Sequence, residues 1–185
     1  MKNKEQNFIV VKSNGVIVKI HYVFCKNEDN SKLKKIEIEI EDKIKANTNA
    51  SDDCDKYDQD VPKSVLYIAK KISLHLQGKM QNFNNKKIIS LLDLTNHSSF
   101  AKNVLEACLN VKPQEIVTYG ELAKYSGYAI NSARAVGRVM SINPYPVIIP
   151  CHRVVAQGKK IGGFQGTKNN IKLKRKLLAL EGKVI

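Results

Sequence analysis

Residues 147–153 constrain this chain more than any other segment, because an apolar run leads directly into a reactive pair. A buried strand over residues 147–149 would end at Pro150 and present a thiol, Cys151, beside an imidazole, His152. A histidine next to a cysteine takes or shares the thiol proton, and the resulting thiolate is a strong nucleophile. The segment therefore predicts a nucleophilic cysteine, although most lone cysteines are small buried hydrophobic residues.

Composition narrows the class of protein. The chain has 185 residues, 43% of them hydrophobic, which is enough for a globular core in one large domain or two small ones. Its net charge of +14 favours a polyanionic partner, although a generally lysine-rich surface is the simpler interpretation. We expect no membrane association and a cytoplasmic location, with the nucleoid as the site in a prokaryote and the nucleus in a eukaryote, because no apolar run is long enough for a signal or a bilayer span.

The first half of the chain predicts a small sheet with a helix. Asn14-Gly15 lies between two apolar runs, which is the strongest short signal for a β-hairpin. Strict alternation of apolar and acidic residues predicts another strand, and spaced apolar residues predict a helix that ends at Gly78. The expected elements are a hairpin over 7–24, a strand over 36–40, a flexible polar loop over 41–61, a helix over 62–76 and a possible strand over 88–92.

The second half is predicted to be mostly helical. Ser98 or Ser99 begins a helix that extends to about residue 110. Thr118 and Glu121 have the spacing of a capping box for the next short helix, and Gly127 breaks that helix. Together with a helix over 132–140, this arrangement predicts a helix-turn-helix. A last helix over 168–180 is expected to bury Ile171, Leu177, Leu178 and Leu180.

These elements predict an α/β (α+β) fold in two parts. Residues 1–93 would form a small N-terminal domain of sheet and helix. Residues 94–185 would form a mostly helical C-terminal domain, with the helix-turn-helix and a short strand that carries the active cysteine.

The other cysteines give no sign of a metal or redox centre. No CxxC pair occurs, and Cys25 and Cys54 have no role that the sequence indicates. Cys108 falls on the inward face of its predicted helix. His21 and His75 would complete a zinc site with Cys25 and Cys54 on paper, but the spacing matches no zinc pattern. We therefore expect no metal and no cofactor.

Several segments, in order, resemble the active domain of the O6-alkylguanine-DNA alkyltransferase family over about residues 95–182. Besides residues 150–153, they are residues 134–137 (Arg-Ala-Val-Gly), 143–144 (Asn-Pro), 162–164 (Gly-Gly-Phe) and 180–182 (Leu-Glu-Gly). The resemblance implies single-turnover DNA repair, in which an alkyl group moves from guanine O6 to the protein's own cysteine, with O4-alkylthymine as a second candidate substrate.

The resemblance also implies catalytic roles. Cys151 would be the nucleophile, His152 its base, and Glu181 the carboxylate that orients the imidazole. Asn143 would hold the active-site backbone, and the Tyr119 hydroxyl would bond to the guanine ring. Arg153 has no family role that the motif indicates, and we expect it to support the structure or to contact phosphate.

The helix of residues 132–140 is implied to bind duplex DNA in the minor groove, as a monomer. Arg134 would fill the gap left by a flipped base, because chemistry on a base requires it to leave the stack. Small residues beside Arg134 would allow close approach: Ser132, Ala133, Ala135 and Gly137. The alkylguanine pocket would be formed by Tyr119, Val154, Gly163, Phe164 and Gln165. Gln165 departs from the family pattern, which puts tolerance of bulky alkyl groups in question.

Three other functions remain open at this point. A lesion-binding protein of the same family would flip the base without transfer, but such proteins lack the cysteine. A helix-turn-helix regulator would use alkylation as a switch, yet no sensing domain is visible. A cysteine hydrolase would explain the Cys-His pair but not Arg134, Tyr119 or Asn143.

Overall fold

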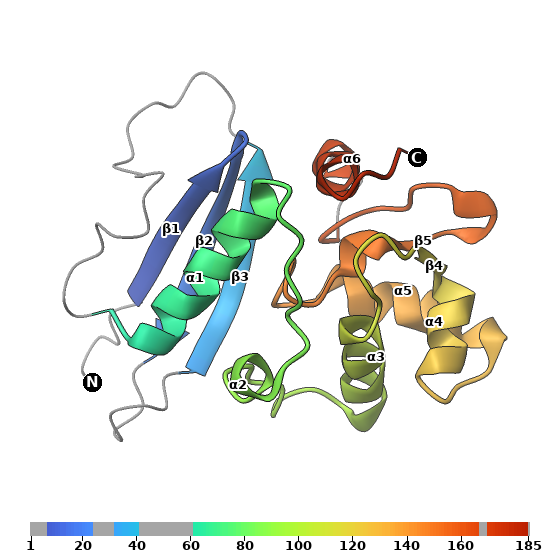
Figure 1. The fold of residues 1–185 in the computed structure, drawn as a ribbon. Helices are drawn as coiled ribbons and strands as arrows, with labels where there is room; N and C mark the ends of the chain where they lie inside the picture. The colour runs from blue at the N-terminus through green and yellow to red at the C-terminus, as the bar shows by residue number, and fades with distance from the viewer. Residues whose placement is uncertain (1–6, 24–31, 41–60, 167–169, 185) are drawn as a thin grey trace.

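The computed structural model describes residues 7–23, 32–40, 61–166 and 170–184. A three-stranded sheet with one covering helix precedes a mostly helical part that contains a short two-stranded parallel sheet (Figure 1). The expected α/β fold class is therefore confirmed. In the described ranges, no helix is both long and apolar enough to cross a membrane.

The N-terminal sheet follows the simple strand rules. β1 (Asn7–Ser13) and β2 (Val16–Val23) pair antiparallel, and β3 (Lys32–Ile40) pairs antiparallel with β2. Asn14 and Gly15 have φ angles of 49° and 64°, which match the twist of a tight hairpin. The hairpin is confirmed, and the third strand begins at Lys32, before the expected residue 36.

Helix α1 (Lys63–Leu76) packs on one face of this sheet (Figure 1). All of the residues predicted to face inward are buried: Val65, Ile68, Ala69, Ile72 and Leu76. The side chain of Asn14 donates a hydrogen bond of 2.6 Å to the carbonyl oxygen of Leu76. The hairpin turn therefore holds the last turn of the helix.

The possible strand over 88–92 is wrong. Residues Lys86–Ile89 form a short helix, α2, because the side chain of Asn85 accepts a hydrogen bond from the amide of Ile88 at 3.0 Å and caps it. Only Leu92 makes a strand-like contact, an isolated parallel bridge to Leu33. A short apolar run does not distinguish a strand from a buried helical turn, and the Asn cap decides it here.

The helical elements of the second half match the prediction closely. The Ser98 side chain caps α3, and Thr118 and Glu121 form the predicted capping box at the start of α4. Gly127 has a φ of 82° and follows α4, so the helix ends where the sequence indicates. The elements are α3 (Ser99–Leu109), β4 (Val117–Thr118), α4 (Tyr119–Tyr125), the 3-10 turn η2 (Ile130–Ser132) and α5 (Ala133–Ser141).

The segment before the cysteine is not a strand, and this corrects the sequence interpretation. Val147 has a φ of 75°, which is strained for a β-branched residue and incompatible with an extended run. Cys151–Arg153 forms a 3-10 turn, η3, and the short strand β5 (Val154–Val155) follows it and pairs parallel with β4. The cysteine therefore lies just before the short strand and not on it.

Two further helical segments complete the chain. A 3-10 turn, η4 (Gln157–Lys159), follows β5, and α6 (Ile171–Leu180) is the last helix. The expected start of that helix at residue 168 lies outside the described residues. Helix α6 buries Leu177 and Leu178 as predicted, but its other fully buried residues are Leu173 and Lys174, while Ile171 and Leu180 are half-buried.

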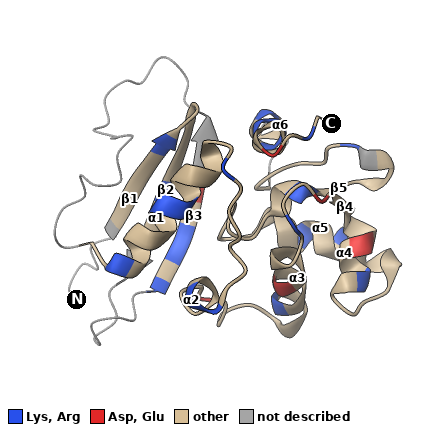
Figure 2. Ribbon diagram, viewed as in Figure 1, with Lys and Arg blue, Asp and Glu red and all other residues tan. Residues whose placement is uncertain are grey.

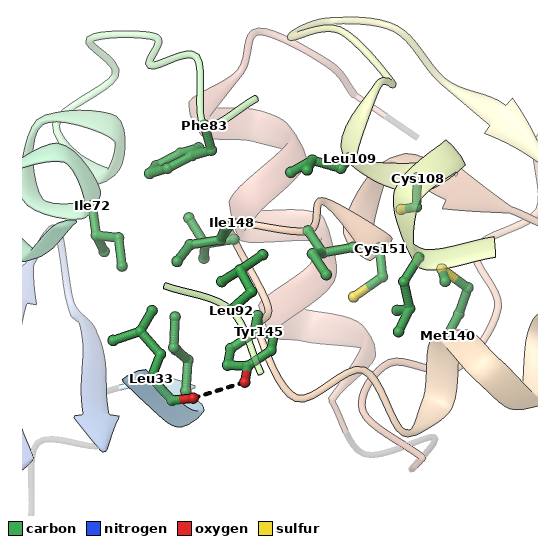
Figure 3. Close-up of a cluster of buried hydrophobic side chains, with 14 of the residues drawn as sticks. Leu33, Ile72, Phe83, Leu92, Cys108, Leu109, Met140, Tyr145, Ile148 and Cys151 are labelled. Atoms are coloured by element: carbon green, nitrogen blue, oxygen red, sulfur yellow. Dashed lines mark hydrogen bonds between the residues drawn. The ribbon is translucent and has the colours of Figure 1, made fainter. Parts of the chain in front are cut away.

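One apolar core runs through both parts of the described chain. Tyr145 connects them, because its hydroxyl donates to the carbonyl oxygen of Leu33 at 2.8 Å (Figure 3). The same hydroxyl accepts from the amide of Asp93 at 2.9 Å. The expected boundary between residues 93 and 94 lies at this junction, and the division into two domains stays a prediction. The expected loop at 41–61 lies outside the described residues except for Val61.

Candidate active site

Asn143 closes the loop that leads to Cys151. Its amide nitrogen donates to the carbonyl oxygen of Ile149 at 2.9 Å and to the Cys151 sulfur at 3.2 Å. Its amide oxygen accepts from the backbone N–H of Tyr145 at 3.0 Å. Side-chain bonds thus take the place of a strand ladder in this loop, and they hold the sulfur directly.

Cys151 lines a cavity of about 270 Å³. Of the two cysteines in the described ranges, Cys108 does not line this cavity. The other lining residues come from α4, α5 and the loop before α6: Tyr119, Gly137, Met140, Ser141, Gly163, Phe164, Gln165 and Gly166. The structure therefore brings together residues from both the predicted pocket and the predicted DNA-binding helix.

Glu181 is the centre of a buried charged cluster. Its Oε1 lies 3.0 Å from Nε2 of His152, the expected contact with the far ring nitrogen. Arg153 donates to both carboxylate oxygens, with the closest contact at 2.6 Å, and also to the carbonyl oxygen of Val111. Arg153 is 4% exposed, so it supports the structure and does not contact phosphate.

The cluster sets the ionisation of its members. Burial alone would raise the pKa of Glu181, but contacts with His152, His75 and Arg153 outweigh it and hold that pKa well below its usual range. Burial lowers the pKa of His152 to about 4, against the favourable effect of Glu181. Nδ1 of His152 has no hydrogen-bond partner among the described residues. His152 is therefore neutral near pH 7, with a free nitrogen that can accept a proton.

The Cys151 thiol is protonated in the resting protein. Burial raises its pKa, and the hydrogen bond from Asn143 and the positive charge of Lys174 offset only part of that shift. A thiol of this kind is a poor nucleophile until a base removes its proton. Reaction of this thiol at neutral pH therefore requires a group that removes its proton.

Lys174 is a buried cation that the sequence analysis missed. It is fully buried on α6, and its Nζ donates to the carbonyl oxygen of Val154 at 2.5 Å. Nζ also lies 5.9 Å from the centre of the Tyr119 ring. Burial lowers the pKa of Lys174 to about 8, so it is mostly charged at neutral pH and favours the Cys151 thiolate.

His75 is the second residue that was missed as part of this site. Its Nε2 lies 3.1 Å from Oε1 of Glu181, although His75 belongs to α1 in the N-terminal part. A sequence signal existed for both residues, because each falls on the apolar stripe of its helix. His75 follows Ile72 by three positions and Lys174 precedes Leu177 by three, which places both side chains on buried faces.

Of the predicted pocket residues, all but Val154 line the cavity that Cys151 lines. Phe164 is buried and Gln165 half-buried in the cavity wall, and Gln165 has a positive φ of 48°. The hydroxyl of Tyr119 forms no hydrogen bond with a described residue, and a Cβ on Gly162 would come within 3.1 Å of it. Val154 does not line the cavity, and its carbonyl oxygen accepts a hydrogen bond from Lys174.

The predicted DNA-binding residues lie at the start of α5. Arg134 and Ala135 are exposed, whereas Ser132, Ala133 and Gly137 are half-buried. Arg134 makes no ion pair or hydrogen bond with any residue in the described ranges, so no described acid pairs with it. Lys and Arg occur on both parts of the molecule, including β3, α1 and α5 (Figure 2).

The proposed zinc ligands do not form one described group. Cys25 and Cys54 lie outside the described residues, while His21 contacts Glu37 and His75 contacts Glu181. His75, His152 and Glu181 place one ligand atom each within 4.8 Å of one another. The guanidinium of Arg153 already occupies both oxygens of that carboxylate, and its positive charge opposes a metal ion at the same position.

The sequence of this chain is similar to those of known methylated-DNA–protein-cysteine methyltransferases. Residues 99–183 match the family described as "6-O-methylguanine DNA methyltransferase, DNA binding domain". A methylated-DNA–protein-cysteine methyltransferase of Metallosphaera sedula is 39% identical over 122 residues, which cover 66% of this chain and 70% of that protein. The same enzyme of Methanothermobacter thermautotrophicus is 31% identical over 68% of this chain and 65% of its own length, just under two thirds.

A solved structure shows the same architecture over almost the whole chain. The OGT of Mycobacterium tuberculosis in complex with DNA has a TM-score of 0.65 and 25% sequence identity, and the match covers 94% of this chain and 91% of that one. The similarity thus extends beyond the cysteine half to the N-terminal sheet and helix.

Proposed function

The chain belongs to the methylated-DNA–protein-cysteine methyltransferase family, and from that premise we propose that Cys151 is the residue that accepts the alkyl group from O6-alkylguanine in duplex DNA. The observation that carries this proposal is the position of Cys151 on the wall of a cavity large enough for part of a base, next to Tyr119 and Phe164. Cys108 is fully buried and does not line that cavity.

The reaction is a single displacement at the alkyl carbon. The bond between that carbon and guanine O6 breaks, a bond from the carbon to the Cys151 sulfur forms, and the electron pair of the broken bond stays on guanine. The thiol proton goes to the free Nδ1 of His152, and the ionised Glu181 stabilises the imidazolium that forms. The thioether product is stable, so each molecule acts once.

Tyr119 and Lys174 are suited to the charge that changes during this step. The hydroxyl of Tyr119 is free to donate to the departing guanine, where negative charge develops. Burial raises the pKa of Tyr119, so it keeps its proton at neutral pH. The cation of Lys174 favours the thiolate that precedes attack. Val154 is left out of base recognition in this proposal, because Lys174 holds its carbonyl.

The loop of residues 162–166 and helix α5 provide the remaining functions. Phe164 would stack on the flipped guanine, and the backbone N–H of Gln165 would face O6. Arg134 would enter the duplex through the minor groove and occupy the space of the flipped base, since the small neighbours Ala133 and Ala135 let α5 approach closely. We propose that one chain binds one lesion, and O4-alkylthymine is a second candidate substrate.

Transfer of a labelled methyl group from O6-methylguanine in duplex DNA tests this proposal. We expect one label per molecule of wild-type protein and none on Cys151→Ala, which should still bind the DNA because phosphate contacts dominate affinity. Cys108→Ala is the matched control and should accept the label. Repeated turnover would support a hydrolase instead, and binding without transfer would support a lesion-binding protein.

A further inference from the structure

His75 is a fully buried histidine with an unusual environment. It lies in the last turn of α1, and its Nε2 is 3.1 Å from Oε1 of Glu181. Its ring packs edge-on against Phe83 and against His152, with ring centres 5.6 Å and 6.4 Å away. Neither ring nitrogen has an aligned hydrogen-bond partner among the described residues.

Packing does not explain a histidine at this position. The neighbours on the buried face of α1 are Ile72 and Leu76, so an apolar side chain would suit the local pattern better. Burying polar nitrogens without aligned hydrogen bonds costs folding free energy, and most buried polar groups in proteins are satisfied. The position of the ring beside the active-site carboxylate indicates what the residue does.

Glu181 presents its two oxygens unequally. Oε1 lies close to His152, Arg153 and His75, whereas Oε2 accepts only from Arg153 in the described part of the chain. An ionised carboxylate repels a nitrogen lone pair, so this arrangement favours an N–H on the Nε2 atom that each ring turns toward Glu181. The Nε2 atoms of both imidazoles thus face the same oxygen, Oε1 of Glu181. The N–H of His75 attracts this oxygen and helps to hold it in place.

We propose that His75 is a positioning residue of the active site, which holds the Glu181 carboxylate from the N-terminal part and thereby keeps His152 oriented to take the proton of Cys151. The proposal rests on the proposed function of Cys151. Helix α1 would then contribute a side chain to the active site in addition to packing beside it.

The hairpin turn helps to set the distance between His75 and Glu181, on which this role depends. Asn14 bonds to the carbonyl oxygen of Leu76, the residue after His75. Lys176 on α6, the helix that leads into Glu181, donates to the carbonyl oxygen of Gly15 at 3.4 Å. The same two-residue turn therefore contacts both helices that carry the histidine and the carboxylate.

Two substitutions separate positioning from packing. His75→Leu removes the N–H edge and keeps an apolar side chain in the core, whereas His75→Gln keeps an N–H donor near the position of Nε2. His21→Leu makes the same chemical change at another buried histidine of the N-terminal part, which pairs with Glu37 away from the site. Thermal unfolding of each variant shows whether it is folded.

Two rates are measured across pH. One is the rate of methyl transfer from saturating duplex DNA, and the other is the rate at which iodoacetamide alkylates Cys151, which is monitored by mass spectrometry. For His75→Leu we expect about a tenfold loss of transfer rate with unchanged DNA affinity, less than the ~10²–10⁴-fold of a direct general base. Reaction of the thiol with iodoacetamide should also require a higher pH. His75→Gln should recover most of both effects, and His21→Leu should behave as the wild type.

Wild-type rates and pH dependence in folded His75→Leu would overturn the proposal, and so would a His75→Gln variant no better than His75→Leu. The iodoacetamide rates need no DNA. If the wild type transfers no methyl group, the proposed function fails, and the thiol reactivity still decides the role of His75.

Discussion

Strands β1 to β3 and the loop of residues 143–154 hold their shapes in different ways. The sheet is fixed by a backbone ladder, with one register shift after His21, and by a buried face that includes Val18 and Ile20. The loop has only scattered backbone hydrogen bonds, such as that from Ile149 to Tyr145, and it depends in addition on the side chain of Asn143, while Val147 takes a strained conformation. Because of this difference, we expect a side chain removed from the sheet to lower only the stability of the protein. A side chain removed around the loop should also move the Cys151 thiol and lower the transfer rate.

The largest effect is expected from Glu181→Gln. The imidazolium of His152 would lose its counter-charge, so transfer should slow by ~10²–10⁴-fold and the apparent pKa of the Cys151 thiol should rise. The measurement is the transfer rate across pH on the fraction of protein that is folded. Leaving Arg153 without a charged partner should also destabilise the protein by ~3–5 kcal/mol. An unchanged rate in folded Glu181→Gln would remove the carboxylate from the mechanism.

Arg134→Ala should have a smaller and substrate-dependent effect. Without the side chain that fills the gap, repair of duplex DNA should fall on the order of tenfold, since unstacking a base costs a few kcal/mol. Reaction with free O6-benzylguanine is the internal control, because a free base needs no opening of the helix. Equal slowing of both substrates would mean that Arg134 serves the structure of α5.

A paired comparison tests the contrast between loop and sheet directly. Asn143→Ala leaves buried backbone groups unpaired and should cost ~1–3 kcal/mol, with a clear loss of transfer rate. Ile20→Val removes one methyl group from the sheet core and should cost ~0.5–1.5 kcal/mol, with the rate unchanged. Chemical unfolding and single-turnover transfer are measured on both variants. Equal effects of both substitutions on the transfer rate would contradict the expected difference between loop and sheet.

His152 should also make the stability of the protein depend on pH, without any change in the mechanism of transfer. His152 has a folded pKa of about 4 against a usual 6.5, so the unfolded chain binds an extra proton between those values. Its contribution to stability is therefore lost as the pH falls from about 6.5 to about 4, by roughly 3 kcal/mol. His152→Gln should show a flatter dependence of the unfolding free energy on pH over this window. Parallel curves would contradict a neutral, buried His152.

The sequence predicted the regular elements well, and physical reasons separate them from the rest. Asn14-Gly15, the alternation before Ile40 and the Thr118–Glu121 box are local signals, and local interactions decide those structures. The residues before Cys151 read as a strand because their apolar pattern is the same for a strand and a buried turn. Their actual shape depends on the hydrogen bonds of Asn143 and on the contact of Tyr145 with Leu33. Tyr145 and Leu33 are far apart in the sequence, so no local pattern predicts that contact.

The same reasoning applies to the site. Cys151, His152, Glu181 and Asn143 were identified from motifs, and the structure brings them together. His75 and Lys174 come from separate helices and enter only through packing of the two parts. Both were detectable as polar residues on apolar helix faces, but the partner that each would meet, Glu181 or Val154, was not.

Mass spectrometry of the reacted protein identifies the cysteine that accepts the methyl group. Wild-type protein is incubated with duplex DNA that contains O6-methylguanine, and then digested. We predict a single added methyl group, on the peptide that contains Cys151, in an amount equal to the lesion repaired. A methyl group on Cys25, Cys54 or Cys108, or repair without any methyl group on the protein, would contradict the account.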